Sequence, residues 1–314
     1  MTAGAMLIPA AMDSDSADLE RRFGGLRRLY GAAGYAAVRQ ARVAVVGLGG
    51  VGSWAVEALA RSGVAALVLI DLDHVAESNI NRQVQALGST LGMAKAEALR
   101  QRIADIHPGC AVTTIEEFAG PDNWPGLLAQ PVDVLIDACD QSAAKLALAA
   151  WALRSGTPLL CVGAAGGKQQ AQLVEVADLA ETTHDPLLAS LRQRLRKQGA
   201  PRQGRIGVSC VFSRESVAMP AQADVGAQGD EGGVGAEAAG PAQGDRGDAA
   251  NAGEAGGAAD ASAAGATDGS LNCAGYGSSV TVTATFGMVA AGEALRLCIA
   301  RVTRPAAAAS EQRP

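Results

Sequence analysis

A glycine-rich segment near residue 50 has the residue types and the spacing of a phosphate-binding turn. Gly47, Gly49 and Gly52 fit the pattern G-x-G-x-x-G, and Gly50 is a further glycine inside it. In this pattern Gly47 permits a tight turn, Gly49 lets a phosphate approach the backbone, and Gly52 lets a helix pack closely against a strand. A helix that begins here offers free N–H groups and the positive end of its dipole to an anion. The segment therefore predicts nucleotide binding, but it does not identify the nucleotide.

Charged and amide side chains follow this turn at positions where apolar runs end. Asp71 closes one such run and suits hydrogen bonding to ribose hydroxyls, a contact that an NAD-dependent enzyme also needs. The other candidates for nucleotide contact are Asp73, Asn79, Asn81, Arg82, Gln83, Lys95, Asp137 and Asp140. Cations beside paired carboxylates are what a triphosphate with Mg²⁺ requires, whereas hydride transfer has no need of this charge. The set favours ATP with Mg²⁺ and leaves an NAD enzyme as the alternative.

Short apolar runs alternate with helical patterns and must position these residues. Strands are predicted at 42–47, 66–71, 111–115, 132–136 and 158–162, and helices at 51–62, 92–106 and 142–154. This order predicts an α/β fold with a Rossmann-like, doubly wound, mostly parallel sheet and helices on both faces. Residues 172–176 and 206–212 alternate more, which predicts a mixed-strand extension. Because open α/β sheets bind ligands at the carboxyl ends of their strands, the candidate residues should meet at one edge.

The charge of the chain is unevenly distributed. Its 314 residues carry a formal net charge of −6, and only 3% are aromatic. Residues 221–270 contain nine acidic residues and one arginine, so they carry −8 and the remainder carries +2. Ala and Gly fill 30 of those 50 positions. Because such small residues bury too little apolar surface to offset the entropy lost on folding, a disordered acidic insertion is predicted. The net charge therefore does not exclude a nucleic-acid partner.

The cysteines and the apolar segments indicate which motifs the chain lacks and in which cellular compartment we expect it. Six cysteines are present and no two form a C-x-x-C pair, which argues against a zinc ribbon and a thioredoxin-like motif. The N-terminus lacks a basic region followed by a long apolar one, so no signal peptide is predicted. Residues 271–292 are uncharged but rich in small and hydroxyl residues, which favours a packed helix over a membrane span. We expect a cytoplasmic protein without membrane association.

Several motifs together resemble a known family. The segments GLGGVGS at 47–53, DLDHV at 71–75, NINRQ at 79–83, GMAKAE at 92–97 and DACD at 137–140 resemble the E1-like activating-enzyme superfamily. The segments RRFGG at 21–25, VGAAGG at 162–167, GVSCVFS at 207–213 and VTATFG at 282–287 resemble its tRNA threonylcarbamoyladenosine dehydratase branch. The resemblance implies an adenylating domain at 20–218, the insertion at 219–270, and a crossover loop and helix at 271–302 that complete the domain.

The resemblance implies an activity and a set of roles. Members of this branch use ATP and Mg²⁺ to adenylate the threonyl carboxylate of N6-threonylcarbamoyladenosine at tRNA position 37, and then cyclise it. Gly49 and Gly52 would cradle phosphate and Asp71 would hold the ribose. Asp140 would bind Mg²⁺, with Asp137 in support. The triphosphate ligands would be Asn81, Arg82 and Lys95, and the catalytic residues would be Arg82, Lys95 and Asp140. A homodimer is also implied.

Two alternatives remain open at this stage. One is E1-like activation of the C-terminus of a sulfur-carrier protein, and the other is a non-catalytic partner in a sulfur relay with a cysteine desulfurase and a sulfur acceptor. Sulfur-carrier relatives place an arginine in a partner's site through an R-x-x-R pattern and often carry two zinc C-x-x-C pairs. Here Gly25 occupies the second arginine position, only Arg22 remains, and no C-x-x-C pair exists, which weighs against a sulfur-carrier substrate.

Two further features are candidates for function. Cys273 lies in a glycine-rich stretch where E1-like enzymes can carry a reactive thiol, although cyclisation needs no enzyme nucleophile. A basic stretch consists of Arg192, Arg194, Arg196, Lys197, Arg202 and Arg205. A run of charges is usually a solvated face, but a tRNA substrate favours phosphate contact here.

Overall fold

The fold is built on one mixed sheet. The computed structural model describes residues 18–218 and 276–303. Seven strands lie in the order β3-β2-β1-β4-β5-β7-β6, all parallel except β6, which pairs antiparallel with β7. Their bounds are β1 Arg42–Val46, β2 Ala66–Ile70, β3 Ala111–Ile115, β4 Val134–Asp137, β5 Leu159–Val162, β6 Val174–Asp178 and β7 Ser209–Ser213. The predicted doubly wound sheet and its mixed extension are confirmed.

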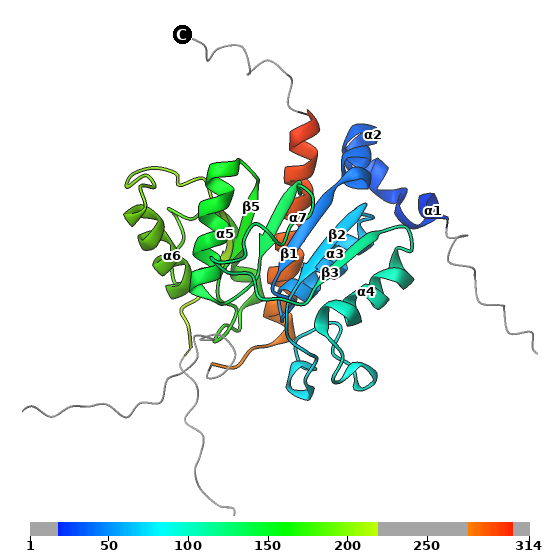
Figure 1. The fold of residues 1–314 in the computed structure, drawn as a ribbon, viewed down its shortest axis with the longest axis horizontal. Coiled ribbons are helices and arrows are strands. Elements are labelled where there is room, and N and C mark those ends of the chain that lie inside the picture. Colours follow the sequence, from blue (N-terminus) through cyan, green and yellow to red (C-terminus); the bar gives the residue numbers. More distant parts are fainter. Residues whose placement is uncertain (1–17, 219–275, 304–314) are drawn as a thin grey trace, which may run out of the picture. The chain divides into compact units, whose positions relative to one another are not determined.

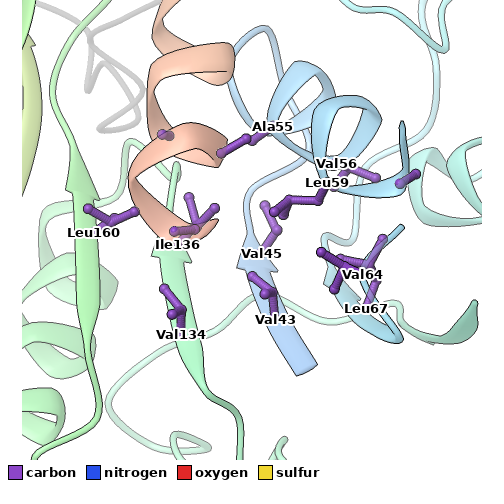
Figure 2. Packing of buried hydrophobic residues seen from close by; sticks show 14 of the residues in the cluster. Val43, Val45, Ala55, Val56, Leu59, Val64, Leu67, Val134, Ile136 and Leu160 are labelled. Carbon is purple, nitrogen blue, oxygen red and sulfur yellow. The ribbon is translucent and has the colours of Figure 1, made fainter. Parts of the chain in front are cut away.

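Helices cover both faces of the sheet (Figure 1). Their bounds are α1 Leu19–Phe23, α2 Gly25–Gln40, α3 Gly52–Arg61, α4 Lys95–Ile106, α5 Ser142–Ser155, α6 Pro186–Lys197 and α7 Val280–Thr303. One core cluster joins α3, α4 and α7 to the sheet, and Figure 2 shows Leu59 of α3 beside Val45 of β1. The second cluster joins α5 and α6 to the opposite face. Continuous β-branched strands are buried because both faces are covered.

The long helix α7 is a core element. It is long and apolar enough to span a membrane by length and composition. However, Val282, Phe286 and Ala290 are fully buried against the sheet and α3. Gly287 permits the close approach, because a Cβ there would come within 2.6 Å of the Val51 carbonyl oxygen. The prediction of a packed helix in this part of the chain agrees with this packing.

The elements predicted from residue 42 onward are confirmed within a few residues, whereas α1 and α2, which precede that residue, are not predicted. The helix predicted from residue 92 begins at Lys95, and the strand predicted from 206 begins at Ser209. Helix α6 is not predicted, because the basic stretch, four of whose six cations lie on this helix, has the pattern of a solvated charge run. The acidic insertion and Cys273 lie outside the described residues.

Candidate functional site

A cavity of about 340 Å³ lies at the carboxyl ends of the central strands. Strands β1 and β4 are neighbours there although the chain leaves them in opposite directions, which is the position where doubly wound sheets bind ligands. Ten of the predicted nucleotide ligands line this cavity: Gly47, Gly49, Gly50, Asp71, Asp73, Asn79, Arg82, Gln83, Lys95 and Asp140. Gly52, Asn81 and Asp137 do not line it. The sequence therefore placed most of the set at one edge.

The glycine turn has three different local environments. Gly47 has φ +85°, and a Cβ would lie 2.7 Å from the backbone nitrogen of Cys139. Gly52 is the first residue of α3, and a Cβ there would overlap the carbonyl oxygen of Gly47. At Gly49 the nearest atom to a Cβ is Gln83 Nε2 at 4.0 Å, so this glycine faces open space. Gly52 serves the packing of helix on strand, and Gly49 leaves room for a ligand.

Asp71 and Lys95 form the wall beyond β2. Asp71 accepts hydrogen bonds from the backbone N–H groups of Leu48 at 2.6 Å and Asp73 at 2.8 Å. Burial raises the pKa of Asp71 above its ordinary value, although Lys95 and these N–H groups oppose the shift. Lys95 donates to Asp73 at 2.7 Å, while the Asp73 side chain is 53% exposed. This pair holds the Lys95 ammonium at the cavity, where it can meet an anion.

Arg82 lies on the loop after β2, between the glycine turn and α7. Its carbonyl oxygen accepts from Trp54 Nε1 at 3.0 Å, which fixes the backbone. Its Nη1 donates to Ser78 O at 2.5 Å and to Asn81 Oδ1 at 3.0 Å. The Nε atom is buried and has no hydrogen-bond partner among the described residues. A buried guanidinium N–H that lacks a partner at a cavity wall fits an anionic ligand.

Asn81 supports the site from outside the cavity. Its Nδ2 donates to the carbonyl oxygen of Ser278, just before α7, at 3.1 Å, and its Oδ1 holds Arg82. Asn79 likewise orders the loop by accepting the Ala76 N–H at 3.0 Å. Gln83 accepts from Gln85 Nε2 at 3.0 Å. These amides therefore fix the loop and its junction with residue 278, rather than all pointing at a ligand.

Asp140 is the carboxylate that suits a cation. It lines the cavity, is half-buried, and has no hydrogen bond or ion pair from another residue in the part of the chain that the structure describes. Burial raises its pKa above the ordinary value, and the nearby Asp73 acts in the same direction. No cluster of three metal-ligating side chains exists among the described residues. One free carboxylate fits Mg²⁺, which is commonly bound by one or two carboxylates together with substrate phosphates.

Asp137 has a different environment from the one expected. Its carboxylate is fully buried and pairs with the ammonium of Lys145 on α5 at 2.9 Å. Lys145 also donates to the carbonyl oxygen of Val162 at 3.0 Å, which ties the ends of β4 and β5 together. Cys139 Sγ donates to the same carboxylate at 2.9 Å. Asp137 therefore shapes the wall of the cavity from behind and does not face a ligand, because Lys145 and Cys139 occupy its oxygens.

The sequence did not single out several residues of this site. Lys145 lies eight residues after Asp137, on the next predicted helix. Its burial could not be predicted, because a lysine in a helix is usually exposed. Phe118 and Gln141 line the cavity from the segments after β3 and β4. Lys168 is 2% exposed and donates to the carbonyl oxygens of His184, Ser213 and Glu215, beside the cavity-lining Gly166. These roles depend on contacts between distant segments.

Two other predicted features are placed away from the cavity. The basic stretch lies on α6 and the loop that follows, and none of its six residues lines the cavity. Arg22 donates to the carbonyl oxygens of Asp105 and Ile106 at 2.8 and 2.6 Å, at the C-terminus of α4. Its guanidinium thus has partners within its own chain.

Known proteins resemble this chain over nearly all of its length. The model of the ThiF family matches residues 22–311. The tRNA threonylcarbamoyladenosine dehydratase of Escherichia coli K12 is 40% identical over 288 residues, which cover 90% of this chain and 96% of that protein. Solved structures of the E. coli dehydratase TcdA in complex with ATP and with AMP are each 36% identical, with TM-scores of 0.71 and 0.72. The alignments cover 91% and 92% of this chain and 97% and 98% of those chains. The chain therefore belongs to the ThiF family and, within it, to the tRNA threonylcarbamoyladenosine dehydratases.

Proposed function

We propose that this protein uses ATP to dehydrate and cyclise N6-threonylcarbamoyladenosine at position 37 of tRNA. One observation carries the proposal: a single cavity joins the glycine turn, Arg82, Lys95 and Asp140 at the crevice of the sheet. The E. coli relative with ATP and AMP complexes supports it, because AMP is the product expected of an adenylating enzyme. The geometry alone fits any carboxylate adenylation, and the family supplies the tRNA substrate.

The nucleotide contacts follow from the local geometry. Gly49 leaves the backbone open to phosphate near the N-terminus of α3, whereas a Cβ at Gly50 would lie 3.1 Å from Thr283 Cγ2. Asp71 would accept hydrogen bonds from ribose hydroxyls on the lone pairs that Leu48 and Asp73 leave free. Arg82 and Lys95 would bind the phosphate oxygens as cations at the two sides of the cavity.

A divalent cation fits Asp140. Mg²⁺ held there would lower the cost of negative charge that develops on the phosphates. Asp73 lies close enough to raise the pKa of Asp140, and its own carboxylate is engaged by Lys95. Asp140 thus offers a free carboxylate beside the paired carboxylate of Asp73, and phosphate oxygens would complete the coordination.

The reaction balances as an adenylation followed by ring closure. The threonyl carboxylate attacks the α-phosphate of ATP, which forms an acyl adenylate and releases pyrophosphate. The neighbouring carbamoyl group then attacks the activated carbonyl, loses a proton, and expels AMP, which carries the former carboxylate oxygen. Because the two groups belong to one molecule, closure benefits from a high effective concentration. Arg82 and Lys95 would stabilise charge on the phosphate during both steps.

Further partners stay predictions. A homodimer is testable by light scattering of the purified chain.

A cysteine desulfurase with its sulfur acceptor would act through Cys273, and persulfide labelling of wild-type and Cys273→Ser protein tests this. The cytoplasm, where tRNA is modified, is the proposed compartment.

Nucleoside mass spectrometry tests the proposed function in cells. We expect tRNA from a strain with the protein to contain the cyclic nucleoside and tRNA from a strain without it to contain only the open form. Pyrophosphate release should depend on tRNA that carries threonylcarbamoyladenosine and not on a ubiquitin-like sulfur carrier. Dependence on the sulfur carrier instead would favour the protein-activating alternative.

A further inference from the structure

A cationic groove of about 740 Å³ lies on the outer face of α6. It is lined by Pro186, Ala189, Ser190, Arg192, Gln193, Arg196, Lys197 and Arg202. The opposite face of the helix buries Leu188, Leu191 and Leu195, so the groove occupies the solvent side of an amphipathic helix. Four of the eight residues are cations, and no acidic residue is among them. The groove therefore presents positive charge without an internal counter-charge.

Helix α6 is fixed beside the cavity at two points. At its start, Asp185 accepts from the backbone N–H groups of Leu188 at 3.0 Å and of Ala164 at 2.8 Å. Ala164 lies between the cavity-lining residues Gly163 and Ala165. Near its end, Arg194 donates to the carbonyl oxygen of Ser142 at 2.9 Å, two residues after Asp140. The helix that carries the groove is thus anchored beside the cavity, and Figure 1 shows α6 next to α5.

The six cations of the basic stretch divide into two kinds. Arg192 donates three hydrogen bonds to Leu179 and Thr182, and Arg194 is held by Ser142. Arg205 lies 3.7 Å from the buried carboxylate of Asp178. These three are engaged in joining α6 and its loop to the rest of the fold.

The other three cations are available to a ligand. Lys197 and Arg202 are exposed and have no hydrogen bond or ion pair within residues 18–218 and 276–303. Arg196 uses only its Nε, in a long 3.3 Å contact with the Pro201 carbonyl oxygen. All three line the groove, so their charge is presented at one place.

We propose that this groove binds backbone phosphates of the tRNA, with Arg196, Lys197 and Arg202 as the phosphate ligands. The inference rests on the proposed function for the identity of the nucleic acid and deepens it by assigning a surface. Phosphate contact suits the groove better than base recognition, because no aromatic side chain lines it for stacking. Arg192, Arg194 and Arg205 are excluded as principal ligands because they have partners in the fold.

Salt-dependent binding of tRNA tests the proposal. The full chain and the variant Arg196→Gln, Lys197→Gln, Arg202→Gln are titrated with tRNA that carries threonylcarbamoyladenosine, at several salt concentrations. The affinity K falls as salt rises, so the slope of log K against log salt is negative. Each lost phosphate contact should reduce the magnitude of this slope by about 0.9, and the triple variant should therefore have a slope smaller in magnitude by about 2 to 3. We expect a Kd for tRNA about 10- to 100-fold weaker at physiological salt, and an unchanged Kd for ATP.

A matched control variant distinguishes phosphate binding at the groove from a general effect of the protein's net charge. Arg28, Arg100 and Arg154 are exposed on α2, α4 and α5, and their change to Gln removes the same charge. This control should keep most of the tRNA affinity. Equal losses in both triple variants, or an unchanged affinity and slope in the groove variant, would overturn the proposal. Failure of the proposed function is distinct, because the unaltered chain would then show no tRNA-dependent AMP release.

Discussion

The ammonium of Lys145 lies 2.9 Å from the carboxylate of Asp137, and both side chains are fully buried beside the cavity. Removing one partner of such a pair leaves an uncompensated charge, so Lys145→Met should cost about 3 to 5 kcal/mol of the free energy of unfolding. Urea unfolding measures this loss. The double variant Asp137→Leu, Lys145→Met should lose less than the sum of the single variants, since neither leaves a charge alone. A loss below about 1 kcal/mol for Lys145→Met contradicts the assigned pairing.

The same pair has a pH signature. Burial by itself would lower the pKa of Lys145, but the Asp137 carboxylate outweighs it and holds the pKa above its ordinary value. A lysine whose pKa rises on folding stabilises fully below its unfolded pKa, about 10.4, and the contribution is lost as the pH rises through the folded pKa. The stability advantage of wild type over the double variant Asp137→Leu, Lys145→Met, which leaves no buried carboxylate to titrate, should therefore be constant near neutrality and shrink only above about pH 10, in urea unfolding at each pH.

Two glycines in the same turn should respond differently to one methyl group. In Gly52→Ala the Cβ would overlap the backbone of Gly47, so the variant should be strongly destabilised or fail to fold. In Gly49→Ala the methyl enters open space, so stability should stay within about 0.5 kcal/mol of wild type. We expect Gly49→Ala to weaken ATP binding instead, as measured by calorimetry. Wild-type ATP affinity in a folded Gly49→Ala protein would remove this glycine from the nucleotide site.

Charge removal at Asp140 tests the cation site. Asp140→Asn keeps the size of the side chain and should lower the rate of AMP formation about 10²- to 10³-fold, as loss of one stabilising electrostatic group does. The Mg²⁺ dependence of ATP affinity should flatten in this variant. Asp122→Asn, an exposed carboxylate on the segment before β4, serves as the control and should behave as wild type. A full Mg²⁺ response in Asp140→Asn would assign the metal to other ligands.

Lys168 should act through the segments that it joins. Its ammonium donates to three carbonyl oxygens, including Glu215 O at 2.6 Å, and Glu215 in turn accepts from Gln169 N at 3.0 Å. Lys168→Met would leave these acceptors without a donor, at a cost of about 1 to 3 kcal/mol. Thermal unfolding should show this loss, and Lys197→Met, which is exposed, should show none. Equal melting temperatures for the two variants would contradict the proposal that Lys168 stabilises the fold by joining these segments.

The sequence was sufficient for the parts of the fold that local pattern determines. The strands β1 to β5 were found because each is a short apolar run, and Gly47, Asp71 and Asp140 were found because they follow such runs. Their convergence follows from parallel strands, which end at one edge.

The remaining features depend on contacts between distant segments. The sequence groups Asp137 with the ligands because it lies at the carboxyl end of a predicted strand, and only the position of Lys145 on α5 shows that its carboxylate is occupied. Arg192 and Arg202 are both arginines of the basic stretch and look alike in the sequence. In the structure Arg192 donates a hydrogen bond to Thr182, whereas Arg202 is exposed. Local spacing cannot predict which charges are paired, because that pairing is a property of the folded chain.

The most direct test of the central claim combines two readouts on the purified chain. The protein is incubated with ATP, Mg²⁺ and tRNA that carries threonylcarbamoyladenosine, and then AMP and the tRNA nucleosides are quantified. We predict one AMP released for each nucleoside converted to a form lighter by one water, and neither product without ATP. AMP release with an unchanged nucleoside, or a dehydrated nucleoside without AMP, would contradict adenylation of the threonyl carboxylate at this site.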